Sequence, residues 1–269
     1  MRVLSVSGQD IRLTGQKMKI EKFDYDSLHS TPWHKHASGQ LYWLNHGILV
    51  IETTSVQWTV TPGSLGWFPA DVSHRAWVPA GVKGQSLYLE PASCPPFPAH
   101  PGVYGADAFV MAILERLCRE GDFSSPAEYQ RHLLKLLGFE IAGAPDLPLQ
   151  LTLPVDRRAR NIANELLKNP ACALDQTQLA KQWGLSVRSL SRLFTQQTGL
   201  SFSQWRQQAK VVTSLQWVLA GLPVSEVALR SGYSNVSAYI DVFRQRFGKT
   251  PGQFQNALLR TESRQKASG

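Results

Sequence analysis

Three histidines and a glutamine are the residues of the N-terminal half best suited to chemistry. His34, His36 and Gln40 share the parity of one face of a β-strand, and His74 is expected to come from a neighbouring strand. If they converge, three imidazoles and an amide could bind a divalent ion such as Fe, Mn, Zn or Ni. The histidines could instead hydrogen-bond a small organic effector, or be satisfied within a core. Gln40 is a poorer ligand than a carboxylate and cannot act as a base, which argues against enzymatic turnover.

The C-terminal half contains one motif twice. The first copy runs from Leu179-Ala180 through Gly184-Leu-Ser186 to Gly199, and the second from Val227-Ala228 through Gly232-Tyr-Ser234 to Gly248. The offset between the copies is 48 residues at the first glycine of each copy and 49 at the last. Each copy has the pattern of an apolar helix, a glycine turn, a capping serine and a second helix with core residues every three to four positions. This pattern predicts two helix-turn-helix motifs.

Local signals place further helices around the two copies. Asp175 with Gln178, and Ser201 with Gln204, have the spacing of capping boxes. Between the copies an apolar stripe over residues 202–220 predicts one helix, and its 19 residues would span roughly 28 Å. Such a spacer would hold two recognition helices about 34 Å apart, so that one chain could enter two successive major grooves of B-DNA.

Residues from about Asp156 to Asn256 resemble the DNA-binding domain of AraC/XylS-type transcriptional regulators. The positions that match in order and spacing are Leu179-Ala180, Gly184-Leu-Ser186, Arg192-Leu-Phe194, Gly199, Gly232-Tyr-Ser234, Phe243-Arg244, Phe247-Gly248 and Thr250-Pro251. Most are core and turn positions, so they indicate the fold rather than the bases read. The chain departs from the family pattern near Val236, where Pro or Gln is more common, and at Gln255, where Arg is more common.

The outward faces of the two recognition helices predict the contacts with DNA. The buried stripe of the first helix leaves Arg188, Ser191 and Arg192 outward, where the family's base-reading positions map, and either arginine could bind guanine O6 and N7. The second helix presents Asn235, Val236, Ser237 and Asp241, with Asp241 in the position of Arg192. A carboxylate repels phosphate, so the second motif is expected mainly to position the DNA backbone, through Arg230, Arg244, Arg246 and Lys249. Phosphate contact or plain solvation remains an alternative for each arginine.

Residues 10–92 alternate short apolar strands with turns, which predicts an antiparallel barrel or jelly roll. The clearest strands are 41–44, 48–52 and 57–60. The segment from His34 to His74 resembles the two cupin motifs, with Gln40 at the usual Glu and Asp71 at a usual Gly. Aromatic side chains could line an effector pocket or simply form core, namely Trp33, Tyr42, Trp43, Trp67, Phe68 and Trp77.

Apolar residues at helical spacing predict two helices between the barrel and a proline-bounded linker. They are Phe109, Ile113, Leu114 and Leu117 in one, and Tyr129, Leu133, Leu136 and Leu137 in the other. We expect both helices to pack on the barrel. The family resemblance also implies a homodimer face here, and packing within the domain is the alternative.

Net charge separates the two halves. The chain holds 28 Lys and Arg against 20 Asp and Glu, a net charge of +8. Residues 1–150 hold 12 basic and 14 acidic side chains, and residues 151–269 hold 16 and 6. Because phosphate binding needs positive charge on the domain that docks, this partition favours nucleic acid as the partner. No apolar run suits a membrane span or a signal peptide, so a cytoplasmic protein is expected.

These observations predict two domains, an N-terminal all-β cupin-like barrel with following helices and a C-terminal all-α double helix-turn-helix. The expected bounds are a sensor barrel over 1–100, a helical segment over 101–143, a linker over 144–155, a DNA-binding domain over 156–257 and a disordered tail over 258–269.

The predicted function is that of a regulator, not an enzyme, whose sensor responds to a small molecule or a metal and modulates binding to promoter DNA. RNA polymerase would be a partner if the protein activates. The alternative is a metal-dependent cupin enzyme tethered to DNA. A DNA-repair methyl acceptor would need a cysteine cluster, which Cys94, Cys118 and Cys172 do not form in the sequence.

Overall fold

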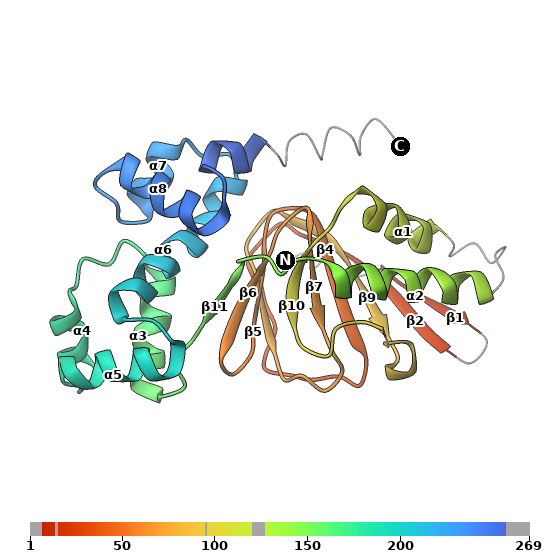
Figure 1. The fold of residues 1–269 in the computed structure, drawn as a ribbon, viewed down its shortest axis with the longest axis horizontal. Coiled ribbons are helices and arrows are strands. Elements are labelled where there is room, and N and C mark those ends of the chain that lie inside the picture. The colour runs from red at the N-terminus through yellow and green to blue at the C-terminus, as the bar shows by residue number, and fades with distance from the viewer. Residues whose placement is uncertain (1–6, 14–15, 95, 120–126, 257–269) are drawn as a thin grey trace. The chain divides into compact units, whose positions relative to one another are not determined.

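The computed structural model describes residues 7–13, 16–94, 96–119 and 127–256 of the chain, and Figure 1 labels their helices and strands. The predicted tail at 258–269 lies outside the described residues. The chain forms two compact units. The first comprises Met1–Thr53 and Trp58–Leu149, and the second comprises Thr54–Gln57 and Gln150–Gly269.

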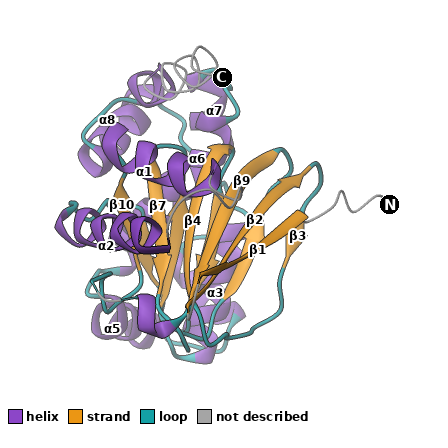
Figure 2. Ribbon diagram, turned by 90° about the vertical axis from the view of Figure 1, so that its right-hand side faces the viewer, coloured by secondary structure: helices purple, strands orange, loops and turns teal. Residues whose placement is uncertain are grey.

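Two β-sheets make up most of the first unit, as predicted, and the strand at Gln150–Thr152 and the first two residues of the strand at Val56–Val60 fall within the second unit (Figure 2). One has the strand order β1-β2-β9-β4-β7-β10 and the other the order β11-β6-β5-β8-β3. Their bounds are β1 Ser7–Leu13, β2 Gln16–Tyr25, β3 His29–Ser30, β4 Gly39–His46, β5 Leu49–Glu52, β6 Val56–Val60, β7 Ser64–Phe68, β8 Arg75–Val78, β9 Val82–Leu89, β10 Gly102–Gly105 and β11 Gln150–Thr152. The strands expected at 41–44, 48–52 and 57–60 are therefore present as β4, β5 and β6.

Two helices cover one face of the six-stranded sheet, after a short 3-10 helix at Pro91–Ser93. They are α1 (Ala108–Arg119) and α2 (Ala127–Gly143), where the apolar spacing predicted them. Their buried residues share one core with Leu41, Trp43 and Trp67 of the sheet. Phe109 was expected to pack inward, but it is 50% exposed, because the buried stripe of α1 starts at Val110 instead.

Helices alone make up most of the second unit, as the sequence predicted. They are α3 Arg157–Lys168, α4 Gln176–Gln182, α5 Val187–Thr198, α6 Phe202–Leu219, α7 Val224–Arg230 and α8 Val236–Phe247. Both capping boxes, at Asp175 and Ser201, are formed. Trp205 of α6 is fully buried and donates from Nε1 to the carbonyl of Thr152 at 2.6 Å. The spacer helix therefore shares a core with the first motif, and it also packs against α7 and α8 of the second.

The change of offset between the two motifs has a structural cause. Ser186 caps α5 by accepting from the backbone N–H of Ser189. Ser234 was expected to cap the second recognition helix, but Asn235 caps α8, accepting from the N–H groups of Ser237 and Ala238. The second turn thus contains one extra residue before its helix begins. Among the described residues, no helix is long and apolar enough to cross a membrane.

Candidate metal site and nucleic-acid interface

The structure brings His34, His36 and His74 together. One ring nitrogen from each lies within 4.8 Å of the others. His34 and His74 form an isolated β-bridge, in which each backbone N–H donates to the other carbonyl at 2.9 Å. The expectation that His34 and His36 share one strand face with Gln40 was wrong, because both precede β4 in an irregular segment and only Gln40 lies in the strand. Backbone pairing between two loops gathers the histidines instead.

Backbone carbonyls fix the orientation of all three imidazole rings. The Nδ1 atoms of His34, His36 and His74 lie 2.9, 2.7 and 2.8 Å from the carbonyls of Pro32, Ser38 and Val72. A carbonyl only accepts, so each Nδ1 must carry the proton, and the lone pair of the neutral ring then lies on Nε2. This arrangement of a second-shell carbonyl on Nδ1 is the one that orients a histidine ligand toward a metal.

His74 is the most buried of the three histidines. Its side chain is buried, and its Nε2 has no hydrogen-bond partner among the described residues. Burial lowers the pKa of His74, the neighbouring His34 and His36 lower it further, and the bond to the Val72 carbonyl offsets only part of that effect. The ring is therefore held neutral, which is the form that binds metal.

Gln40 completes the group. Its side-chain amide lies 2.8 Å from His36 Nε2. In the neutral ring, a proton on His36 Nδ1 leaves none on Nε2, so the amide would turn its NH₂ group toward Nε2 or both atoms would face a shared cation. In the second arrangement, Gln40 Oε1 would be an oxygen ligand beside three imidazole nitrogens. Such a set of ligands suits Zn, Fe, Ni or Mn.

Asp71 holds the loop that carries His36. Its backbone N–H donates to the His36 carbonyl at 2.9 Å, and its φ of 62° lies in the left-handed region. Glycine adopts this conformation without strain, which explains why the cupin motif usually has Gly at the position of Asp71, and Asp is one of the few other residues that enter this region.

The aromatic residues expected to line a pocket separate into three groups. Tyr42 lies on the same side of the sheet as Phe68, which is 5.8 Å from the His74 ring. Trp43 and Trp67 do not belong there, because they pack with α1 and α2 on the opposite face. Trp33 and Trp77 are 46% and 38% exposed, so neither is enclosed.

Two aromatic residues near the histidines were missed from the sequence. Trp58 lies 5.5 Å from Phe68, and its buried Nε1 has no partner among the described residues. Tyr88 lies 5.7 Å from the His36 ring and pairs with Gln40 across β9 and β4. Burial, and then the charge of Glu21, raise the pKa of Tyr88 to about 12. Only the register between strands could have identified them.

The first recognition helix, α5, presents two unengaged guanidinium groups. Arg188 and Arg192 are exposed, and neither has a hydrogen-bond or ion-pair partner within the part of the chain that the structure describes. Ser191 is half-buried, and its Oγ accepts from Gln176 Nε2 at 2.7 Å. The two arginines are thus exposed cationic side chains of α5.

The second recognition helix, α8, is occupied by contacts of its own. Asp241 pairs with Arg244 at 3.0 Å, and Asn235 is engaged in capping. Ser237 and Lys249 are exposed, Val236 is half-buried, and Arg230 pairs with Glu226 at 2.5 Å.

Arg246 was expected to contact the DNA backbone, but it is half-buried and donates to Gln208 and to the Gln150 carbonyl. Its guanidinium therefore serves to hold the unit together. The helices α5 and α8 thus differ in the charge that they present to a duplex.

Two helix-turn-helix motifs around a buried spacer, in a chain that also carries a histidine cluster in a two-sheet domain, define a DNA-binding regulator with a ligand-binding domain. Sequence comparison agrees with this class. The model of an AraC-like ligand binding domain matches residues 22–139, and that of a helix-turn-helix domain matches residues 179–257. The HTH-type transcriptional regulator NimR of Escherichia coli is 30% identical over 238 residues, which cover 88% of this chain and 86% of NimR. The chain belongs to the AraC-type family of helix-turn-helix transcriptional regulators.

Other similar proteins match smaller parts or are more distant. The HTH-type transcriptional regulator RipA of Corynebacterium glutamicum is 35% identical over 107 residues, covering 40% of this chain and 32% of RipA. The crystal structure of ToxT from Vibrio cholerae covers 91% of this chain and 96% of ToxT, with 12% identity and a TM-score of 0.37.

Proposed function

We propose that a divalent metal ion bound by His34, His36 and His74, with Gln40 as a fourth ligand, changes the affinity of this regulator for promoter DNA. The observation that carries the proposal is the set of three Nδ1–carbonyl hydrogen bonds, which leave three Nε2 lone pairs near one point. The buried, unpartnered Nε2 of His74 supports it, since a buried polar atom without a partner is costly. The bound ion would supply bonds that join the two loops.

A small organic effector is the second candidate. The buried Trp58 Nε1, which has no partner among the residues that the structure describes, favours it, because an acceptor on a ligand beside Phe68 and Tyr42 would satisfy this donor. Both candidates make the protein a sensor and not an enzyme, acting in the cytoplasm where its DNA target is accessible.

The DNA side of the proposal assigns different tasks to the two recognition helices. Arg188 and Arg192 of α5 would read bases, and Ser191 would contribute only after releasing Gln176. Ser237, Lys249 and Arg230 would position the second motif on the backbone, with Asp241 limiting its positive charge.

We further propose that the protein binds as a homodimer through α1 and α2, whose outer faces expose Phe109, Leu136 and Phe139.

Calorimetric titration of the full chain with Mn²⁺, Ni²⁺, Zn²⁺ and, without oxygen, Fe²⁺ tests the metal site. We expect one ion to bind stoichiometrically, and His74→Ala to weaken it by more than about tenfold, since loss even of an outer-shell partner costs about 10–100-fold. His132→Ala, an exposed histidine of α2, is the matched control and should bind as the wild type does.

A third variant separates the two candidate ligands. Gln40→Glu replaces the amide by a carboxylate, so it should tighten metal binding. No binding of any of the four ions, or equal losses in His74→Ala and His132→Ala, would contradict the metal site and leave the organic effector.

A further inference from the structure

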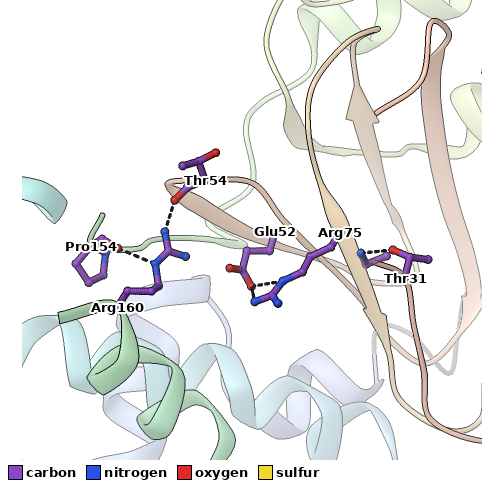
Figure 3. Close-up of polar contacts among 7 residues, drawn as sticks. Thr31, Glu52, Thr54, Arg75, Pro154 and Arg160 are labelled. Carbon is purple, nitrogen blue, oxygen red and sulfur yellow. Dashed lines mark hydrogen bonds and ion pairs between the residues drawn. The ribbon is translucent and has the colours of Figure 1, made fainter. Parts of the chain in front are cut away.

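A short segment of the N-terminal half belongs to the DNA-binding unit. Thr54–Gln57 lies between the end of β5 and the first residues of β6, yet clusters with Gln150–Gly269. Within that unit Arg160 of α3 donates to the carbonyls of Thr54 and Pro154 (Figure 3). The backbone N–H of Leu153 donates to the Ser55 carbonyl at 2.7 Å. The segment is thus bonded to the residues that begin the helical unit.

The N-terminal end of this segment is connected through the backbone to Glu52, which contacts the residue that follows His74. Glu52, two residues before Thr54, accepts from Nη2 and Nε of Arg75 at 2.9 and 3.3 Å (Figure 3). The Glu52 side chain is 13% exposed and the Arg75 side chain 41%, so the carboxylate of this pair is shielded from solvent while the guanidinium is partly exposed. Arg75 directly follows His74, and its guanidinium lies 5.2 Å from the ring of Trp33, which directly precedes His34. Arg75 is therefore adjacent to His74 in the sequence and in contact with the residue that precedes His34.

The C-terminal end of the segment is connected to the same histidine cluster by aromatic contacts. Trp58, directly after Gln57, lies 5.5 Å from Phe68, and Phe68 lies 5.8 Å from His74. A change in the position of His74 would therefore act on both ends of Thr54–Gln57, at one end through an ion pair and at the other through aromatic packing.

From this juxtaposition we propose that Thr54–Gln57 is the relay by which the histidine site controls the DNA-binding unit, with Glu52–Arg75 as its input and Arg160 as its output. The inference rests on the proposed metal site. Metal binding adds side-chain bonds between His34 and His74 to the backbone bridge that already joins them. Arg75 and Glu52 follow because each is bonded in register across β8 and β5, and the turn then shifts the carbonyl that Arg160 holds. α3 begins beside that contact and packs against α5 and α6.

The test compares the ratio of operator affinities with and without metal in full-length variants. The operator is a duplex selected by the wild type from a random pool, and the probe is whichever of Mn²⁺, Fe²⁺, Ni²⁺ or Zn²⁺ binds in calorimetry. For the wild type we expect a ratio of about 5–150, the usual range of allosteric coupling. Arg160→Gln and Glu52→Gln should bring the ratio within about twofold of 1 while still binding the metal.

Arg157→Gln is the matched control, because it removes the same charge from an exposed position of α3 and should keep the wild-type ratio. Hydrogen exchange provides an independent readout, in which metal should alter the protection of the amides at 54–57 in the wild type but not in Glu52→Gln. A wild-type ratio preserved in Arg160→Gln and Glu52→Gln would overturn the relay and leave the metal site intact. Absence of metal binding in the wild type would overturn both.

Discussion

Replacement of Arg192 by alanine tests whether α5 reads bases. Arg192 is exposed and has no partner in the described part of the chain, so its loss should leave the fold unchanged. Its guanidinium could form two parallel hydrogen bonds to guanine, whereas a phosphate contact would use it chiefly as a positive charge. These two roles predict different measurements.

The expected magnitude follows from the contact. A bidentate arginine–guanine pair discriminates by about 1–3 kcal/mol, which at about 1.4 kcal/mol per tenfold corresponds to a loss of roughly 5–150-fold on the operator. A scrambled duplex offers no such pair, so its affinity should fall much less. If Arg192 instead contacts phosphate, both affinities should fall alike and the slope of log affinity against log salt should decrease by about 0.9.

Fluorescence anisotropy on the selected operator and a scrambled duplex, at several salt concentrations, measures these quantities. Arg192→Lys is the matched variant, because it keeps the charge and loses the planar fork of donors. Base reading predicts that Arg192→Lys loses operator affinity nearly as Arg192→Ala does. Equal losses on both duplexes in Arg192→Ala, restored by Arg192→Lys, would refute the reasoning.

Four further predictions concern single residues. Asp241→Ala should raise affinity for any duplex and steepen the salt slope by about 0.9, because it frees Arg244 for a phosphate; unchanged anisotropy titrations would contradict this. Asn235→Ala should lower the free energy of unfolding in urea by about 0.5–2 kcal/mol through loss of the α8 cap, whereas Asn235→Asp should not; equal stability of both variants would argue against capping. Burial raises the pKa of Cys118 to about 11, so a thiol reagent at pH 8 should label it slowly until the protein unfolds; rapid native labelling would contradict the burial. Phe139→Glu should shift sedimentation from dimer to monomer, and an unchanged dimer would place the interface elsewhere.

Local signals made the helical half predictable from the sequence. Capping boxes at Asp175 and Ser201 and the repeated glycine turns involve residues three to four positions apart, so they can be recognised in the sequence itself. The extra turn residue before α8 appears in the sequence only as an offset of 49 instead of 48. That Asn235 takes over the cap, and so has its side chain engaged, required the structure.

Long-range pairing limited what could be predicted about the sensor. The histidines were recognised by their motif, but loop-to-loop backbone bonds bring them together, not the strand parity that the spacing suggested. Whether Trp43 and Trp67 line a pocket or form core could not be decided from the sequence, because the sequence does not show which face of a strand the helices will cover. From the sequence, Arg246 was predicted to face solvent and DNA. Its partners, Gln208 and the Gln150 carbonyl, come close to it only in the folded unit.

One titration tests the central claim, that the histidine site controls DNA binding, most directly. Operator affinity of the full-length wild type and of His74→Ala is measured by anisotropy as the bound ion is added. The account predicts a change of about fivefold or more in the wild type and none in His74→Ala. The same response in both proteins, or an operator affinity of the wild type that does not change as metal saturates its site, would contradict it.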